Sequence, residues 1–166
     1  PNPEAKSAVE KFLRERGYQI HPVTVDNMDW LFSRAYAEAL TRGDEAAAQS
    51  IRVEYVAYME RMFEFCETYS REVTGREIPQ VLMLTAGALN ADSFDELSAM
   101  IRRRGYTFVT LEEALKDPAY AEPDALYKNG VSWIHRWRRA KGLEQKWEPE
   151  APKFVDDLYK AGQKVD

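Results

Sequence analysis

The chain has 166 residues with a formal net charge of −5; 45% of them are hydrophobic and 31% are charged, as in an ordinary globular domain with a real core. An acidic chain without a basic patch is not expected to bind nucleic acid, and no apolar run approaches the roughly 18 residues of a membrane span. The single cysteine, Cys66, excludes an internal disulfide and a thiolate metal cluster, and its apolar neighbours place it in or near the core.

The first predicted element is a helix that Asn2 can cap and that Gly17 ends, because glycine readily adopts the left-handed conformation of a helix C-terminus. Residues 18–25 are then predicted to form a strand, which Pro22 interrupts and thereby marks as an edge or a bulge. A second helix is expected over residues 30–40. These assignments make the opening of the chain a helix–strand–helix unit.

A long amphipathic helix is predicted from Glu45 to about Val73, where the sequence has neither glycine nor proline. Its apolar residues recur every three or four positions between Ile51 and Cys66. Because the segment is longer than the usual 8–20 residues, we interpret residues 44–74 as a long helical insertion.

Two more strands and several short helices are predicted in the second half. Residues 78–84 are almost continuously apolar, which favours a strand covered on both faces. Two Ser/Thr-x-x-Glu capping boxes, at 93–96 and 110–113, predict helices on either side of a short strand at 106–109. The aromatic-rich stretch 132–137 follows, and the pattern of 154–159 predicts a last amphipathic helix.

A repeat indicates how these elements connect. Residues 12–18 resemble residues 100–106, and each stretch is a helix end, a glycine and a tyrosine that leads into a strand. Repeated helix–strand units imply parallel strands with right-handed crossovers. Three strands leave long unpaired edges. The expected fold is therefore α/β, with 1–166 as a single domain that is part of a larger sheet or distorted (β/α) barrel, incomplete in this chain.

The strongest candidate for chemistry follows the first predicted strand. Residues 23–25 are β-branched and uncharged, and Asp26, Asp29 and Trp30 come directly after them. Sites in α/β proteins are built at the carboxyl ends of strands, which favours a functional Asp-x-x-Asp-Trp motif. The alternative is that Asp26 or Asn27 caps the next helix while Trp30 is a core residue.

Several stretches together resemble the C-terminal half of a polysaccharide deacetylase domain of the NodB-homology type. Residues 26–30 resemble the Asp-x-x-Asp-Trp motif of that family, and residues 81–85 occupy the place of its Leu-x-His motif. The similarity covers nearly the whole chain, and its other parts are residues 89–97, 104–115, 117–120 and 132–137.

The resemblance implies a metal-dependent hydrolase that removes N- or O-acetyl groups from sugars, built on a distorted β/α barrel. The family's catalytic base and Asp-His-His metal ligands lie in the first half of the barrel, and nothing in this chain matches them. His21 and His135 are the only histidines. His135 is expected to serve packing and hydrogen bonding, and His21 to be structural or exposed. This chain alone is therefore expected to hold no metal, whereas the complete domain would bind a divalent, zinc-like ion.

The resemblance also suggests roles for single residues. Thr85 stands where the family has a histidine that acts as general acid, and a threonine hydroxyl cannot supply a proton near neutral pH. Asp26 and Asp29 would support the site electrostatically, so that catalytic roles are expected for Asp26, Asp29 and Thr85. Trp30 would form a wall of the sugar groove, with Leu84 and Gly87 beside Thr85 as further substrate contacts.

Three functions follow as expectations. The first is a deacetylase-like hydrolase of acetylated carbohydrates, whose metal and base come from a missing N-terminal segment or a partner chain. The second is a catalytically inactive carbohydrate-binding or protein-interaction module that keeps the fold. The third is a structural protein with the helix between Ile51 and Cys66 as its partner surface. Whether the chain is an enzyme stays open, and the resemblance favours an extracytoplasmic location.

Overall fold

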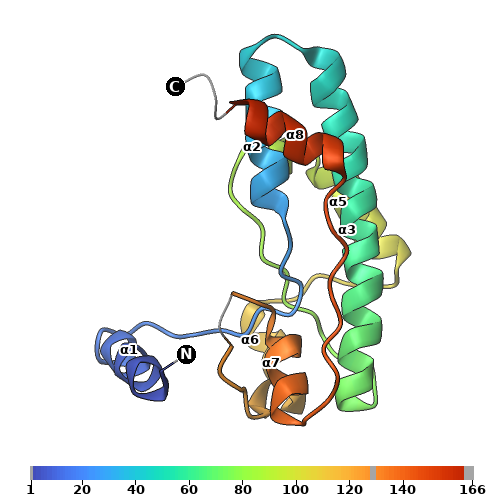
Figure 1. Ribbon diagram of the computed structural model, residues 1–166. Helices are drawn as coiled ribbons and strands as arrows, with labels where there is room; N and C mark the ends of the chain where they lie inside the picture. The colour runs from blue at the N-terminus through green and yellow to red at the C-terminus, as the bar shows by residue number, and fades with distance from the viewer. Residues whose placement is uncertain (1, 128–129, 163–166) are drawn as a thin grey trace. The chain divides into compact units, whose positions relative to one another are not determined.

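The computed structural model describes residues 2–127 and 130–162, and their regular structure is helical throughout (Figure 1). The helices in chain order are α1 (Pro3–Glu15), α2 (Asp29–Thr41), α3 (Glu45–Thr74), α4 (Ala88–Asp92), α5 (Phe94–Arg103), α6 (Leu111–Ala114), the 3₁₀ helix η1 (Pro118–Ala121), α7 (Trp133–Ala140) and α8 (Lys153–Gly162). None of them is long and apolar enough to cross a lipid bilayer.

The predicted α/β fold, as part of a β/α barrel with parallel strands, is wrong: the described residues form no strand, sheet or barrel. Residues 18–25 and 78–84 meet only at one parallel bridge between Val25 and Leu82, beside which the Thr24 and Val25 N–H groups donate to the Val81 carbonyl at 3.0 Å. Residues 106–109 form no bridge with other described residues. A strand is held by ladder hydrogen bonds to its neighbours, and these segments have almost none within the chain.

The helices agree with the sequence much more closely. Asn2 caps α1 by accepting from the Glu4 N–H at 2.9 Å, and Gly17 follows with φ +75°. The Thr110 side chain accepts from the Glu113 N–H at 3.2 Å and so caps α6 as predicted. The capping box predicted at 93–96 is wrong in detail, because the side chain of Ser93 makes no capping hydrogen bond to α5.

The chain divides into two compact units, each of which takes part of α3. Of the described residues, unit 1 comprises 2–26, 66–82, 110–127 and 130–146, and unit 2 comprises 27–65, 83–109 and 147–162. The apolar face of α3 that was considered as a partner surface is buried within the protein. Its side chains are at most 1% exposed at Ile51, Tyr55, Met59, Met62 and Cys66. This apolar face is therefore part of the core, and Cys66 is a core residue as predicted.

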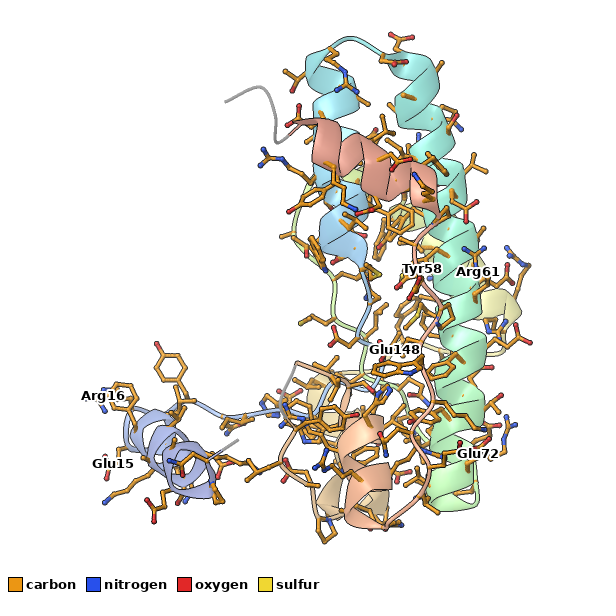
Figure 2. The ribbon with its side chains drawn as sticks, viewed as in Figure 1. Glu15, Arg16, Tyr58, Arg61, Glu72 and Glu148 are labelled. Atoms are coloured by element: carbon orange, nitrogen blue, oxygen red, sulfur yellow. The ribbon has the colours of Figure 1, made fainter. Side chains whose placement is uncertain are left out.

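Unit 1 is organised around the side chain of Arg138 on α7, which is only 4% exposed. Its guanidinium donates to the Glu72 carboxylate at 2.7 Å and twice to the Glu144 carbonyl, at 2.9 and 2.6 Å. It also lies over the ring of Tyr69, 4.3 Å from the ring centre. A buried cation needs such partners, so these bonds tie α7 and the following loop to α3, where Figure 2 marks Glu72.

Unit 2 packs α2, α4, α5 and α8 with the first part of α3. The ring of Phe32 on α2 packs on Tyr55 and Tyr58 of α3, with ring centres 5.4 and 5.1 Å apart. Helix α8 lies against α2, as Figure 1 shows, and α4 also contacts α2. This packing brings the start of α2, the loop before α4 and the middle of α3 together.

Because the Glu72 carboxylate pairs with the buried Arg138, Glu72→Gln is expected to lower the free energy of unfolding by about 1–2 kcal/mol in urea denaturation. Glu77→Gln is the matched control. Glu77 pairs with Arg71 on the surface, where both side chains are at least half exposed, and its loss is expected to cost under about 0.5 kcal/mol. Equal effects of the two substitutions would contradict this account of unit 1.

Candidate functional site

Two of the predicted site residues of unit 2 meet at the side chain of Asp29, the first residue of α2. Asp29 is 4% exposed. One carboxylate oxygen accepts from the Thr85 hydroxyl at 2.9 Å, and the other accepts from the Thr85 N–H at 2.5 Å and the Asn90 amide at 2.9 Å. Three donors compensate the loss of water around the buried charge. The structure therefore brings Asp29 and Thr85, which are 56 positions apart in the sequence, into direct contact.

The backbone on both sides of this contact is held by further hydrogen bonds. The Asn27 side chain accepts from the Asp29 N–H at 2.8 Å and donates to the Met83 carbonyl at 2.8 Å. The Met28 N–H donates to the hydroxyl of Tyr58 on α3 at 3.0 Å, at the position marked in Figure 2. The N-cap of α2 is Met28 and no side chain caps it, so neither Asp26 nor Asn27 takes the N-cap position that the alternative gave them. Asn27 instead satisfies the N–H of Asp29 from one position earlier and also fixes the loop that carries Thr85.

Asn90 and Tyr55 support the carboxylate, and sequence reasoning missed both. The Asn90 amide donates to Asp29 and to the Thr85 carbonyl, while its oxygen accepts from the Tyr55 hydroxyl at 2.6 Å. Burial and then the nearby charge of Asp29 raise the pKa of Tyr55 far above its usual value, so that the phenol stays a donor. The sequence held little to mark Asn90 and Tyr55 as supports of a buried carboxylate, because single polar residues among apolar ones are common in helices.

The predicted substrate-contact residues have different surroundings. Trp30 is 51% exposed, which rules out the alternative that it is a core residue, and its ring meets that of Tyr159 edge-on with centres 5.7 Å apart. Thr85 and Gly87 are exposed and Leu84 is half-buried. Gly87 has an extended backbone with φ −160°, and a Cβ there would meet open space, so none of the residues that the structure describes requires a glycine at this position.

Asp26 is half-buried and is the last residue of unit 1. Burial lowers the pKa of His135, and the nearby charge of Asp26 opposes this effect only in part. His135 is 3% exposed, and its ring nitrogens contact the Ser132 hydroxyl at 2.9 Å and the Lys146 carbonyl at 3.1 Å. Because a carbonyl only accepts, the Lys146 contact places the ring proton on Nε2. His135 is therefore a hydrogen-bonded core residue, in line with the structural reading.

The chemistry available around Asp29 is limited. The Thr85 hydroxyl donates its hydrogen bond to Asp29, so its oxygen can accept a hydrogen bond from a ligand, but the hydroxyl cannot protonate a leaving group. The described residues also contain no group of three or more His, Cys, Asp or Glu side chains that could hold a metal ion. The residues present therefore do not fit the divalent ion that the family resemblance implies.

No protein-family model matches this chain, and no curated protein or solved structure matches it significantly.

Replacing the buried carboxylate tests whether the Asp29 network holds unit 2 together. In Asp29→Asn an amide NH₂ would face donors, so we expect the free energy of unfolding to fall by about 2–3 kcal/mol in urea denaturation. Asp95→Asn is the matched control, since Asp95 is also in the first turn of a helix but is exposed. It is expected to change stability by less than about 0.5 kcal/mol. A loss in Asp29→Asn no larger than the control's would contradict the network's role.

The buried ring of His135 is expected to make the stability of the protein depend on pH. Burial lowers its pKa below the usual 6.5, so the unfolded chain binds this proton more readily than the folded one. The stability that the neutral ring contributes is present above pH 6.5 and is lost as the pH falls through the lowered pKa. His135→Gln, which keeps a donor and an acceptor, is expected to show a shallower loss of stability between pH 6.5 and 5 in denaturation series. Parallel curves for the two proteins would count against a neutral buried histidine.

Proposed function

We propose that this chain contributes to a polysaccharide deacetylase-like hydrolase that acts on amide- or ester-linked acetyl groups of sugars, with the metal and base supplied by residues outside this chain. The observation that carries the proposal is the direct hydrogen bonding between Asp29 and Thr85. They come from the two separate stretches that resemble family motifs, and a chance resemblance would give no reason for these two residues to touch.

In this proposal the residues of unit 2 orient the sugar. Asp29 fixes the side chain and the N–H of Thr85, and Asn90 holds the carboxylate in place. The hydroxyl of Thr85 is then left to accept from a hydroxyl or N–H of the sugar. Trp30 and Tyr159 offer exposed or half-exposed aromatic rings, which suit the apolar face of a sugar ring.

Thr85 also sets a limit on the rate. General acid–base catalysis contributes typically about 10²–10⁴-fold, and no side chain bonded to Asp29 can release a proton near neutral pH. The proton for the leaving group would then come from water. Hydrolysis by this protein is therefore expected to be slow compared with that of a variant that carries an imidazole at position 85.

A second candidate function is sugar binding without hydrolysis, as a carbohydrate-binding module. Thr85 favours it specifically, because an acceptor that is fixed by a buried carboxylate suits recognition as well as catalysis. The same residues would contact the sugar in both candidates. They differ in whether acetate is released.

The test is Thr85→His in the native full-length protein, assayed by acetate release from chitin oligosaccharides and from acetylated xylan. Thr85 is exposed, so the imidazole needs no new cavity, and we expect the rate to rise by about 10²–10⁴-fold. Thr85→Val removes the hydroxyl without adding a titratable group and is expected to give no gain. If neither the native protein nor Thr85→His releases acetate while oligosaccharides still bind, the binding module is the better description.

A further inference from the structure

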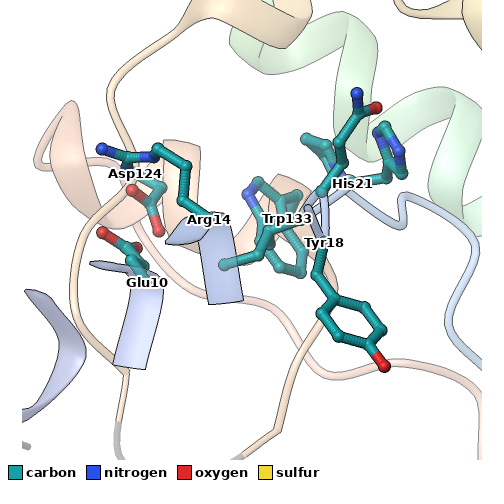
Figure 3. A pocket seen from close by; sticks show the side chains of 9 residues that line it. Glu10, Arg14, Tyr18, His21, Asp124 and Trp133 are labelled. Carbon is teal, nitrogen blue, oxygen red and sulfur yellow. The ribbon is translucent and has the colours of Figure 1, made fainter. Parts of the chain in front are cut away.

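Unit 1 has a groove of about 510 Å³, a volume typical of small-ligand sites. It lies between α1, the segment that follows α1, and the start of α7. Figure 3 shows the side chains that line it, with Glu10 and Asp124 on one side and His21 on the other side of Trp133. The residues that matter for recognition are Glu10, Arg14, Tyr18, His21, Asp124 and Trp133.

The charges in this groove are mixed. Two carboxylates, Glu10 and Asp124, face one guanidinium, Arg14, and the imidazole of His21. Asp124 is already paired with Lys6, at 2.8 and 2.9 Å, and lies 3.5 Å from Arg136. A phosphate ligand would meet the two carboxylates and a cation would meet the guanidinium. The balance of charge therefore favours a neutral ligand with many polar groups.

Several polar groups that line the groove make no hydrogen bond to other described residues. In the part of the chain that the structure describes, the side chains of Arg14 and Gln19 and the indole N–H of Trp133 make no hydrogen bond. Arg14 and Gln19 are also exposed, so they can reach a ligand without disturbing the core. Together with the carboxylates they offer both donors and acceptors, which is what hydroxyl groups require.

Two aromatic side chains complete the groove. Trp133 is half-buried, and the guanidinium of Arg136 lies 4.2 Å from its ring centre, which holds the indole in one orientation. Tyr18 is 65% exposed. A large aromatic surface that is fixed or exposed next to planar polar groups is suited to the apolar face and the hydroxyl rim of a sugar ring.

We propose that the groove formed by Trp133, Tyr18, Arg14, Gln19 and Asp124 is a saccharide-binding site, separate from the Asp29 site. The ligand is a short neutral oligosaccharide, with a sugar ring against the aromatic side chains and its hydroxyls bonded to Arg14, Gln19 and the Trp133 N–H. The assignment of a saccharide to this groove rests on the groove's own side chains. Only the expectation that the saccharide is acetylated rests on the proposed function. A peptide is disfavoured, because Pro22 in the groove wall lacks the N–H that would pair with a peptide backbone.

The test is a titration of the full chain with chitotriose, and with cellotriose as the sugar without acetyl groups, followed by ¹H–¹⁵N NMR. We expect saturable shifts of the Trp133 indole and the Arg14 side-chain signals. Arg14→Ala and Trp133→Ala are each expected to weaken chitotriose binding about tenfold. Trp147→Ala is the matched control, because Trp147 is 85% exposed and does not line the groove, and its dissociation constant should equal the wild-type value.

The outcomes separate this inference from the proposed function. Trp133 begins α7, so Arg14→Ala, which alters only an exposed side chain, decides the result if Trp133→Ala unfolds the protein. Acetate release by the native protein without shifts in the groove would overturn the saccharide site and leave the hydrolase proposal standing. Groove shifts without acetate release would support the site and count against hydrolysis. Shifts that an extended peptide causes and neither sugar causes would also overturn it.

Discussion

The buried carboxylate of Asp29 is the constraint on which unit 2 depends. A carboxylate removed from water is costly unless donors surround it, and here the donors come from two residues outside α2. The Thr85 loop and Asn90 of α4 must both stay close to the start of α2 for the charge to be tolerated. Through Asn90 the network reaches Tyr55 on α3, so that one charge links three helices and a loop.

Unit 1 has the same arrangement with the opposite sign. The guanidinium of Arg138 is as buried as Asp29, and it is matched by the Glu72 carboxylate and the Glu144 carbonyl. In each unit a charged side chain near a helix end bonds both to another helix, at Glu72 of α3 or Asn90 of α4, and to an irregular segment, at Glu144 or Thr85. Such hydrogen bonds are directional, so they fix irregular segments that hydrophobic contacts alone would leave poorly defined.

The Asp29 network also shapes what the site offers to a ligand. The Thr85 hydroxyl is fixed because it donates to Asp29. Toward a ligand it can therefore act as a hydrogen-bond acceptor but not as a proton donor. The groove at Trp133 has the opposite character, because its unpaired groups are mainly donors. Both sites combine such groups with aromatic side chains that are at least partly exposed, and this combination is the common basis of the two carbohydrate proposals.

The sequence by itself determined the helices. Caps such as Asn2 and Thr110, the left-handed Gly17 and the apolar spacing between Ile51 and Cys66 act within a few residues, so the bounds of α1 and α3 and the start of α6 could be predicted. Strands depend on partners far along the chain. The apolar residues at 78–84 therefore had the pattern of a strand. Among the described residues, however, their only β pairing is the single bridge between Leu82 and Val25. The contacts of Asn90 and Tyr55 also depend on residues far along the chain, so the sequence did not reveal them. For the same reason it did not reveal that the described residues form no α/β sheet. Only the tertiary structure decided that Asp29 would be buried against Thr85, because that contact joins residues 56 positions apart. The cost of desolvating the Asp29 carboxylate is offset by donors from Thr85 and Asn90, which local sequence cannot place beside it.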